Sequence, residues 1–174
     1  MILHNVEIWY CKMNPDRPVK SSDKDKPDYW EVQIRTEDKE IKKEWEALNI
    51  NVKAVIPDDD KPPFFKAKFR RKVINSHGEE AECPLIVNGN LDVIDPTTIG
   101  NGSIGNVQLF QFNYPAGKDY AAGISSVLMK VQLTKHLVYV SNREEFDKTE
   151  TETVTPEDKP MDNAPEAEDP SKEF

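Results

Sequence analysis

Residues 64–73 read FFKAKFRRKV, an alternation of apolar and basic side chains that is typical of a β-strand. Successive strand side chains point to opposite faces, so one face is apolar and the other is cationic. The apolar face holds Phe65, Ala67, Phe69 and Val73. The cationic face, called the basic ladder below, holds Lys66, Lys68, Arg70 and Lys72. Arg71 falls on the apolar face, which indicates either a bulge or the rim of a barrel at that position.

The basic ladder suits an anionic ligand, but a solvated surface would show the same pattern. Same-face neighbours lie ~7 Å apart and repel by only ~0.6 kcal/mol in water, before salt reduces the repulsion further. A folded domain can therefore carry the basic ladder without a bound anion. An edge strand that uses lysine to discourage aggregation is the alternative interpretation.

Charge is divided unevenly along the 174 residues. Residues 144–174 contain 12 acidic and 3 basic residues, a net charge of −9 that equals the formal net charge of the whole chain. Residues 1–143 keep 20 of the 32 acidic and 20 of the 23 basic residues and are therefore neutral. Prolines recur in the acidic segment, and large apolar residues are scarce. We expect one folded domain over 1–143 and a disordered acidic tail over 144–174 that ends on Phe174.

The remaining periodicities predict a small, mainly β domain. Alternating patterns predict further strands over residues 2–12, 29–36, 107–114 and 124–140, and residues 79–87 lead into another strand through PLIV at 84–87. In the strand predicted over 124–140, the inward side chains are expected to be Val127, Met129, Val131, Leu133 and Leu137. Residues 36–49 change to helical spacing, with Ile41, Trp45 and Leu48 on one side. About six strands and one helix indicate an antiparallel barrel or sandwich.

Three motifs resemble nucleotide-binding or metal-binding sites, but the residues around them do not fit such sites. Gly100–Gly105 reads GNGSIG, but strand-like residues follow where a dinucleotide-binding helix must begin. Its glycines more simply permit a sharp turn or a close approach of another chain segment. The consecutive Asp58–Asp60 cannot converge on one metal ion, and Cys11 and Cys83 stand apart from any zinc-ligand spacing. We therefore expect no enzyme, no cofactor and no metal site.

Aromatic side chains on the predicted strands are a second feature that suits a nucleic acid. Phe110, Phe112 and Tyr114 share one face of the strand predicted over 107–114, while Trp9 and Tyr29 fall on faces that are otherwise polar. Bases stack on such rings without regard to sequence, and lysine and arginine follow the phosphates. A core position is the alternative for Phe110 and Phe112.

The order of these segments resembles that of bacteriophage single-stranded DNA-binding proteins with an OB-fold. The resemblance rests on YWEVQI at 29–34, a helix, FKAKF at 65–69, IGNGS at 99–103, and the strands over 107–114 and 125–138. It extends to the end of the chain, where an acidic residue precedes a terminal phenylalanine. The tail departs from the family pattern, because prolines and lysines dilute its acidic residues.

The resemblance implies an OB-fold-like antiparallel β-barrel with one inserted α-helix, and a protein that coats single-stranded DNA in phage DNA replication, recombination and repair. The cationic candidates for DNA binding are Lys66, Lys68, Arg70, Arg71, Lys72, Arg35 and Lys130. The stacking candidates are Tyr29, Phe110, Phe112 and Tyr114. The tail is expected to compete with DNA and to contact replisome proteins through Glu168, Asp169, Glu173 and Phe174. An interaction scaffold whose barrel binds protein and not nucleic acid is the alternative.

The sequence also bears on where the protein is located and whether it forms a dimer. The start of the chain, MILHNVEIWY, lacks the pattern of a secretory signal, and no apolar run approaches the ~18 residues that span a bilayer. We expect no membrane partner and a location in the cytoplasm of the host cell. A homodimer is left open by the sequence.

Overall fold

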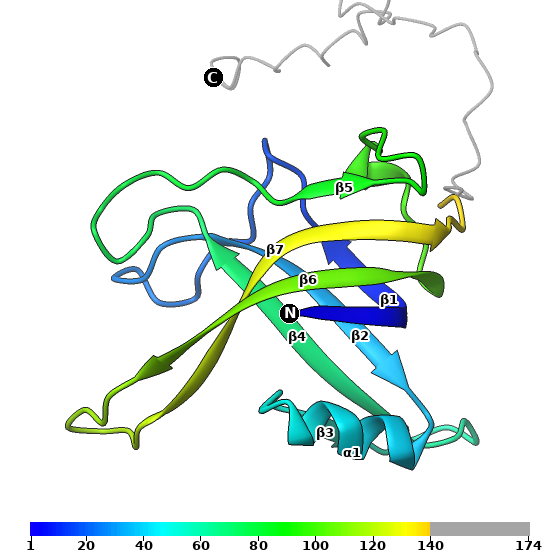
Figure 1. Cartoon of the computed structure of the whole chain (residues 1–174), viewed down its shortest axis with the longest axis horizontal. Coiled ribbons are helices and arrows are strands. Elements are labelled where there is room, and N and C mark those ends of the chain that lie inside the picture. Colours follow the sequence, from blue (N-terminus) through cyan, green and yellow to red (C-terminus); the bar gives the residue numbers. More distant parts are fainter. Residues whose placement is uncertain (140–174) are drawn as a thin grey trace, which may run out of the picture. The chain divides into compact units, whose positions relative to one another are not determined.

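The computed structural model describes residues 1–139, which fold into seven β-strands, one α-helix and one short 3-10 helix (Figure 1). The strands are β1 (Ile2–Lys12), β2 (Tyr29–Thr36), β3 (Lys53–Val55), β4 (Phe64–Lys72), β5 (Leu85–Val87), β6 (Ser103–Tyr114) and β7 (Gly123–Lys135). The helices are α1 (Lys39–Ala47) and the 3-10 turn η1 (Pro96–Thr98). The sequence predicted the long strands and the helix. It missed β3, whose three residues are too few to show a period.

The strands form one sheet that closes on itself. Their order is β3-β4-β2-β1-β6-β7-β5, and an additional pairing between β4 and β7 closes a barrel of β1, β2, β4, β7 and β6. Neighbours within the barrel run antiparallel, except that the closing pair is parallel and joins Arg70 to Val127. The predicted fold class is confirmed. Figure 1 shows α1 and β3 on one side of the barrel and β5 on the other.

The barrel interior is filled by aliphatic and aromatic side chains from every barrel strand. Val32, Val107, Leu128 and Val131 are fully enclosed. Such closely packed apolar contact is the main stabilising term of a small domain. The remaining barrel positions of this core are Leu3, Val6, Ile8, Trp30, Ile34, Ala67, Phe69, Leu109 and Leu133.

Bulges change which side chains face the core. In β1 the register shifts between Leu3 and Val6, and Asn5 adopts a positive φ of 51°. In β7 the register with β6 shifts between Gln108 and Leu109, and Leu128 becomes the buried residue. An extra residue in one strand reverses the alternation beyond it.

The prediction that Val127 and Met129 face inward is therefore wrong, and that for Leu137 is wrong because β7 ends before it, at Lys135. Val127 is half-buried, and Met129 and Leu137 are exposed. Val131 and Leu133, which follow the bulge, are buried as expected. The sequence carries no glycine or proline that would have indicated the bulge at Met129.

Helix α1 packs on the barrel through one buried residue, Trp45. Asp38 caps its first turn by accepting a hydrogen bond from the Glu40 backbone N–H at 2.7 Å. Trp45 is the buried residue of the helix, whereas Ile41 and Leu48 are exposed. The predicted helix is confirmed. Of the three apolar residues that were expected on its inner side, only Trp45 is buried.

The glycines of the GNGSIG segment serve close packing of the backbone. A Cβ at Gly100 would lie 2.8 Å from the Leu137 carbonyl oxygen, and one at Gly105 would collide with the Gln132 carbonyl oxygen. Gly102 has a φ of +90°, which favours glycine. The segment continues directly into β6, so the prediction that a strand and not a helix follows these glycines is confirmed.

Several predictions lie outside the described residues. They are the domain boundary at 143, the disorder of the tail over 144–174, and the contacts expected of its Glu168, Asp169, Glu173 and Phe174. The strand predicted over 124–140 is too long, since β7 ends at Lys135. Within residues 1–139, no helix is long and apolar enough to cross a membrane.

Candidate nucleic-acid interface

The basic ladder lies on the outer face of β4. Ala67 and Phe69 are buried in the core, while the ladder residues between and beyond them point to solvent. Lys68, Arg70 and Lys72 are exposed and Lys66 is half-buried. The alternation predicted from residues 64–73 is confirmed.

Two exposed phenylalanines lie on the same outer face. Through the β4–β7 pairing Arg70 is opposite Val127, and Val127 is in turn opposite Phe110 of β6. Phe110 is 57% exposed and Phe112 is 43% exposed. Their ring centroids lie 6.2 Å apart with an interplanar angle of 26°, a stacked arrangement. Val107 and Leu109 take the core positions of this strand, so Phe110 and Phe112 do not belong to the core.

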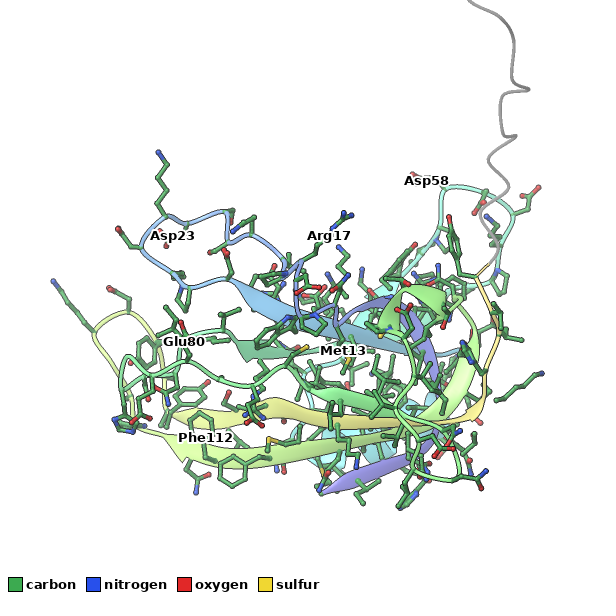
Figure 2. The ribbon with its side chains drawn as sticks, turned by 90° about the horizontal axis from the view of Figure 1, so that it is seen from above. Met13, Arg17, Asp23, Asp58, Glu80 and Phe112 are labelled. Carbon is green, nitrogen blue, oxygen red and sulfur yellow. The ribbon has the colours of Figure 1, made fainter. Side chains whose placement is uncertain are left out.

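The cations and the phenylalanines line one open groove, called the main groove below. Its volume is about 950 Å³. Its lining comes from β4, β6 and β7. The segment after β4, which includes Glu80, also lines the groove; Figure 2 shows Glu80 and Phe112 at the same end of the molecule. The groove residues that could contact a nucleic acid are Lys68, Arg70, Arg71, Lys72, Phe110 and Phe112.

A second, smaller groove continues along the ladder. This side groove has a volume of about 400 Å³ and is lined by Asn51, Lys53, Lys66, Lys68 and Arg70. Lys68 and Arg70 line both grooves, so the two form one track across β4. Lys53 lies opposite Lys66 on β3 and was missed by the sequence analysis. Only the recognition of β3 could have found it.

Arg71 reaches the main groove despite lying on the apolar face of β4. The pairing of β4 with β2 runs without a register shift, so there is no bulge at this residue. The Arg71 Nη1 atom lies 3.5 Å from the Met129 sulfur. Of the two arrangements that the sequence left open, the structure shows the one in which Arg71 emerges at the barrel rim.

A buried carboxylate lies beneath the ladder. The Glu31 side chain, on β2, is only 5% exposed. It accepts hydrogen bonds from Lys68 Nζ at 3.2 Å and from Arg70 Nε at 2.5 Å. Burial raises the pKa of Glu31, but the hydrogen bonds from Arg70 and Lys68 outweigh it and hold the pKa below its ordinary value. Alternation alone placed Glu31 on an outward face and gave no sign that neighbouring side chains cover it.

Tyr29 lies next to the same cluster. The Arg70 guanidinium carbon is 4.3 Å from the centre of the Tyr29 ring, a cation–π contact. The ring is half-buried, and Arg70 covers one of its faces. Tyr29 thus supports Arg70 in this structure.

Arg35 lies in a separate aromatic box. Its guanidinium carbon is 3.9 Å from the Trp9 ring centre and 4.3 Å from that of Phe64. This box belongs to a small pocket of about 160 Å³ that shares no residue with the two grooves. It lies on the same outer face, because Arg35 is the cross-strand partner of Lys66.

Two further candidates from the sequence lie apart from the grooves. Tyr114 sits over Gly123 at the end of the β6–β7 hairpin and makes an edge contact with Tyr120, with ring centroids 6.0 Å apart. Lys130 pairs with Leu85 of β5, on the same edge of β7 that pairs with β4 but three residues further along the strand than Val127. Neither residue lines the main groove or the side groove.

Metal-ligand groups and cysteines are the other features to consider in the part of the chain that the structure describes. No group of three or more His, Cys, Asp or Glu residues within 1–139 is arranged to hold a metal ion. Cys11 and Cys83 are free thiols. Burial raises the pKa of Cys11 to about 12 and that of Cys83 to about 11, so both thiols are poor nucleophiles at neutral pH.

Comparisons with known proteins identify the fold. No protein-family model matches the sequence, and no curated protein matches it. Among solved structures, a C-terminally truncated single-stranded DNA-binding protein of bacteriophage Enc34 aligns with a TM-score of 0.52 and 17% identity. The alignment covers 77% of this chain and 84% of that one. The same phage protein in complex with single-stranded DNA aligns with a TM-score of 0.51 and 16% identity, over 77% and 85% of the two chains.

The fold is therefore that of solved bacteriophage single-stranded DNA-binding proteins. The single-stranded DNA-binding protein gp2.5 of bacteriophage T7 aligns with a TM-score of 0.47 and 15% identity. That alignment covers 84% of this chain and 96% of that one. The resemblance noted in the sequence is confirmed at the level of the fold.

Proposed function

We propose that this chain binds single-stranded DNA with little regard to sequence and is not an enzyme. The observation that carries the proposal is the main groove, where four cationic side chains meet a pair of exposed, stacked phenylalanines. Single-stranded nucleic acid offers the complementary chemistry, since its phosphates are anionic and every base has an aromatic face.

Each part of the track has a distinct role in this proposal. Lys66, Lys68, Arg71 and Lys72 contact phosphates, and Arg70 contacts a phosphate through its Nη atoms. Phe110 and Phe112 stack with bases, with Tyr29 holding Arg70 in place. Arg35 extends the cationic face beyond Lys66, and Lys130 and Tyr114 are outlying contacts for a longer strand.

The fold supports this choice of ligand. One solved protein with the same fold is described as being in complex with single-stranded DNA. By extension we propose that this chain coats single strands during phage DNA replication, recombination and repair, in the cytoplasm of the host cell.

We further propose that the tail over 144–174 competes with DNA and contacts replisome proteins. Its net charge of −9 is tethered to a neutral domain that carries a basic track. Tethering gives such a segment a high effective concentration at the track. The contacts with replisome proteins are assigned to Glu168, Asp169, Glu173 and Phe174. Removal of 144–174 is expected to tighten DNA binding at low salt; unchanged or weaker binding would contradict competition by the tail.

Binding of a labelled oligothymidine strand, compared with a duplex of equal length, tests the function. The five cations at Lys66, Lys68, Arg70, Arg71 and Lys72, reduced by the charge of Glu31, act on about four phosphates. The logarithm of the binding constant should then fall with the logarithm of salt concentration with a slope of roughly −3. No binding, or a slope near zero, favours the protein-binding scaffold instead. Sedimentation velocity of the free chain tests for a homodimer.

A further inference from the structure

Glu31 occupies an unusual position for an acidic residue. It lies on the outer face of β2, directly opposite Arg70 in the middle of the basic ladder. Its carboxylate is almost completely covered, whereas the side chains of Lys68 and Arg70 that bond to it are 44% and 51% exposed. The anion is therefore fixed in place, while both cations reach solvent and the two grooves.

The hydrogen bonds of the cluster leave part of Arg70 free. Glu31 accepts from Arg70 Nε, and the guanidinium plane rests on the Tyr29 ring. Within residues 1–139, the Nη atoms of Arg70 have no hydrogen-bond acceptor. A guanidinium held at Nε and on one face presents its Nη edge in a defined direction, which suits bidentate contact with a phosphate.

Glu31 also lowers the net positive charge at the place where a phosphate would bind. A phosphate on Arg70 would lie within several ångströms of the carboxylate, which repels it. Lys68 and Arg70 are already partly neutralised before any ligand arrives, so their binding to a phosphate releases fewer counterions than two free cations would.

We propose that Glu31 is a built-in competitor of the DNA backbone, a fixed carboxylate that shares Lys68 and Arg70 with a bound phosphate and so lowers both affinity and salt dependence. The inference rests on the proposed function. It assigns to Glu31 the control of how readily a strand is released from the centre of the track.

A purely structural ion pair would behave differently. Burying a charge is costly, and the attraction of its ion-pair partners repays that cost only in a low-dielectric interior with excellent geometry. Here both partners remain half-exposed, so the carboxylate adds little stability beyond the hydrogen bonds that a glutamine could retain in part. Glu31→Gln removes the charge and keeps the shape of the side chain.

The experiment measures binding of fluorescein-labelled oligothymidine by anisotropy at several salt concentrations, with the full-length wild-type chain and Glu31→Gln. We expect the variant to bind at least about threefold more tightly at low salt, the effect of one charge ~7 Å away in water. The salt slope should steepen by about 0.7, the value for one further phosphate contact on a single strand.

The matched control is Asp23→Asn, which makes the same charge change at an exposed ion pair with Lys26 on the loop between β1 and β2 (Figure 2). Asp23 lines neither groove, so this variant is expected to leave the slope unchanged. Equal or weaker binding by a folded Glu31→Gln chain, or an unchanged slope, overturns the proposal while DNA binding by the wild type still supports the function. No binding by the wild type overturns the function itself.

A second pair of variants keeps the test decisive if Glu31→Gln does not fold. Lys66 belongs to the same ladder but has no ion-pair partner within residues 1–139, unlike Lys68. Lys66→Met should therefore reduce the slope by about 0.7, and Lys68→Met by less than half of that. An equal or larger loss for Lys68→Met contradicts a shared, partly neutralised lysine.

Discussion

The exposed phenylalanine pair on β6 allows base stacking to be tested separately from charge. The perturbation is the double variant Phe110→Ala/Phe112→Ala. Both rings lie outside the core, since Val107 and Leu109 fill the interior of this strand. We therefore expect the free energy of unfolding to change by less than ~1 kcal/mol.

The expected loss of binding follows from the geometry of the pair. A base stacked on one ring contributes ~1–3 kcal/mol by alanine substitution. Because the two rings stack on each other at 6.2 Å, their effects are not simply additive. We expect a combined loss of ~2 kcal/mol or more, which is about 30-fold in affinity. The salt slope should stay unchanged, because no cation is removed.

Fluorescence anisotropy with labelled oligothymidine measures both quantities. Tyr139→Ala serves as the control, since this tyrosine is exposed but lines neither groove. An affinity loss of less than about threefold in the folded double variant would refute base stacking on this pair. A comparable loss for the control would show that the effect is not local to the groove.

Three further outcomes are expected. Gly105→Ala should lower the free energy of unfolding by ~1–3 kcal/mol in urea titrations, because the new Cβ meets the Gln132 carbonyl oxygen; an unchanged midpoint would contradict this. Because burial raises the pKa of Cys11 to about 12 and that of Cys83 to about 11, both from an ordinary 9.0, the protonated thiols favour the fold below pH 9.0. That contribution is lost as the pH rises through these values. Alkylation by iodoacetamide at pH 9.0 should be at least ~10-fold slower in the folded chain than in urea; equal rates would count against buried thiols. Arg35→Ala should weaken DNA binding less than Lys66→Met in the anisotropy assay, because Trp9 and Phe64 cover the guanidinium; a larger loss would place Arg35 in the main DNA contact.

The sequence predicted those features that depend on local periodicity. The alternation over residues 64–73 identified β4, its buried Ala67 and Phe69, and the outward ladder. The shared face of Phe110 and Phe112 was also visible, although the choice between core and surface was not. That choice depends on which neighbouring side chains fill the barrel, and this is a property of the closed sheet.

Features that depend on contacts between distant segments were not predictable in the same way. The bulge in β7 moves Leu128 inward, and no residue type marks it. Glu31 looked like an ordinary outward residue, because only the pairing of β2 with β4 brings it under Lys68 and Arg70. Lys53 became part of the track through a strand of three residues.

The central claim is that the track across β4, β6 and β7 is the DNA site. Amide chemical-shift mapping of the full-length chain with a short oligothymidine strand tests it most directly. We predict that the largest shifts occur at residues 66–72, 110–112 and 125–129. Shifts confined to β5 and residues 88–94, with this track unaffected, would contradict the account.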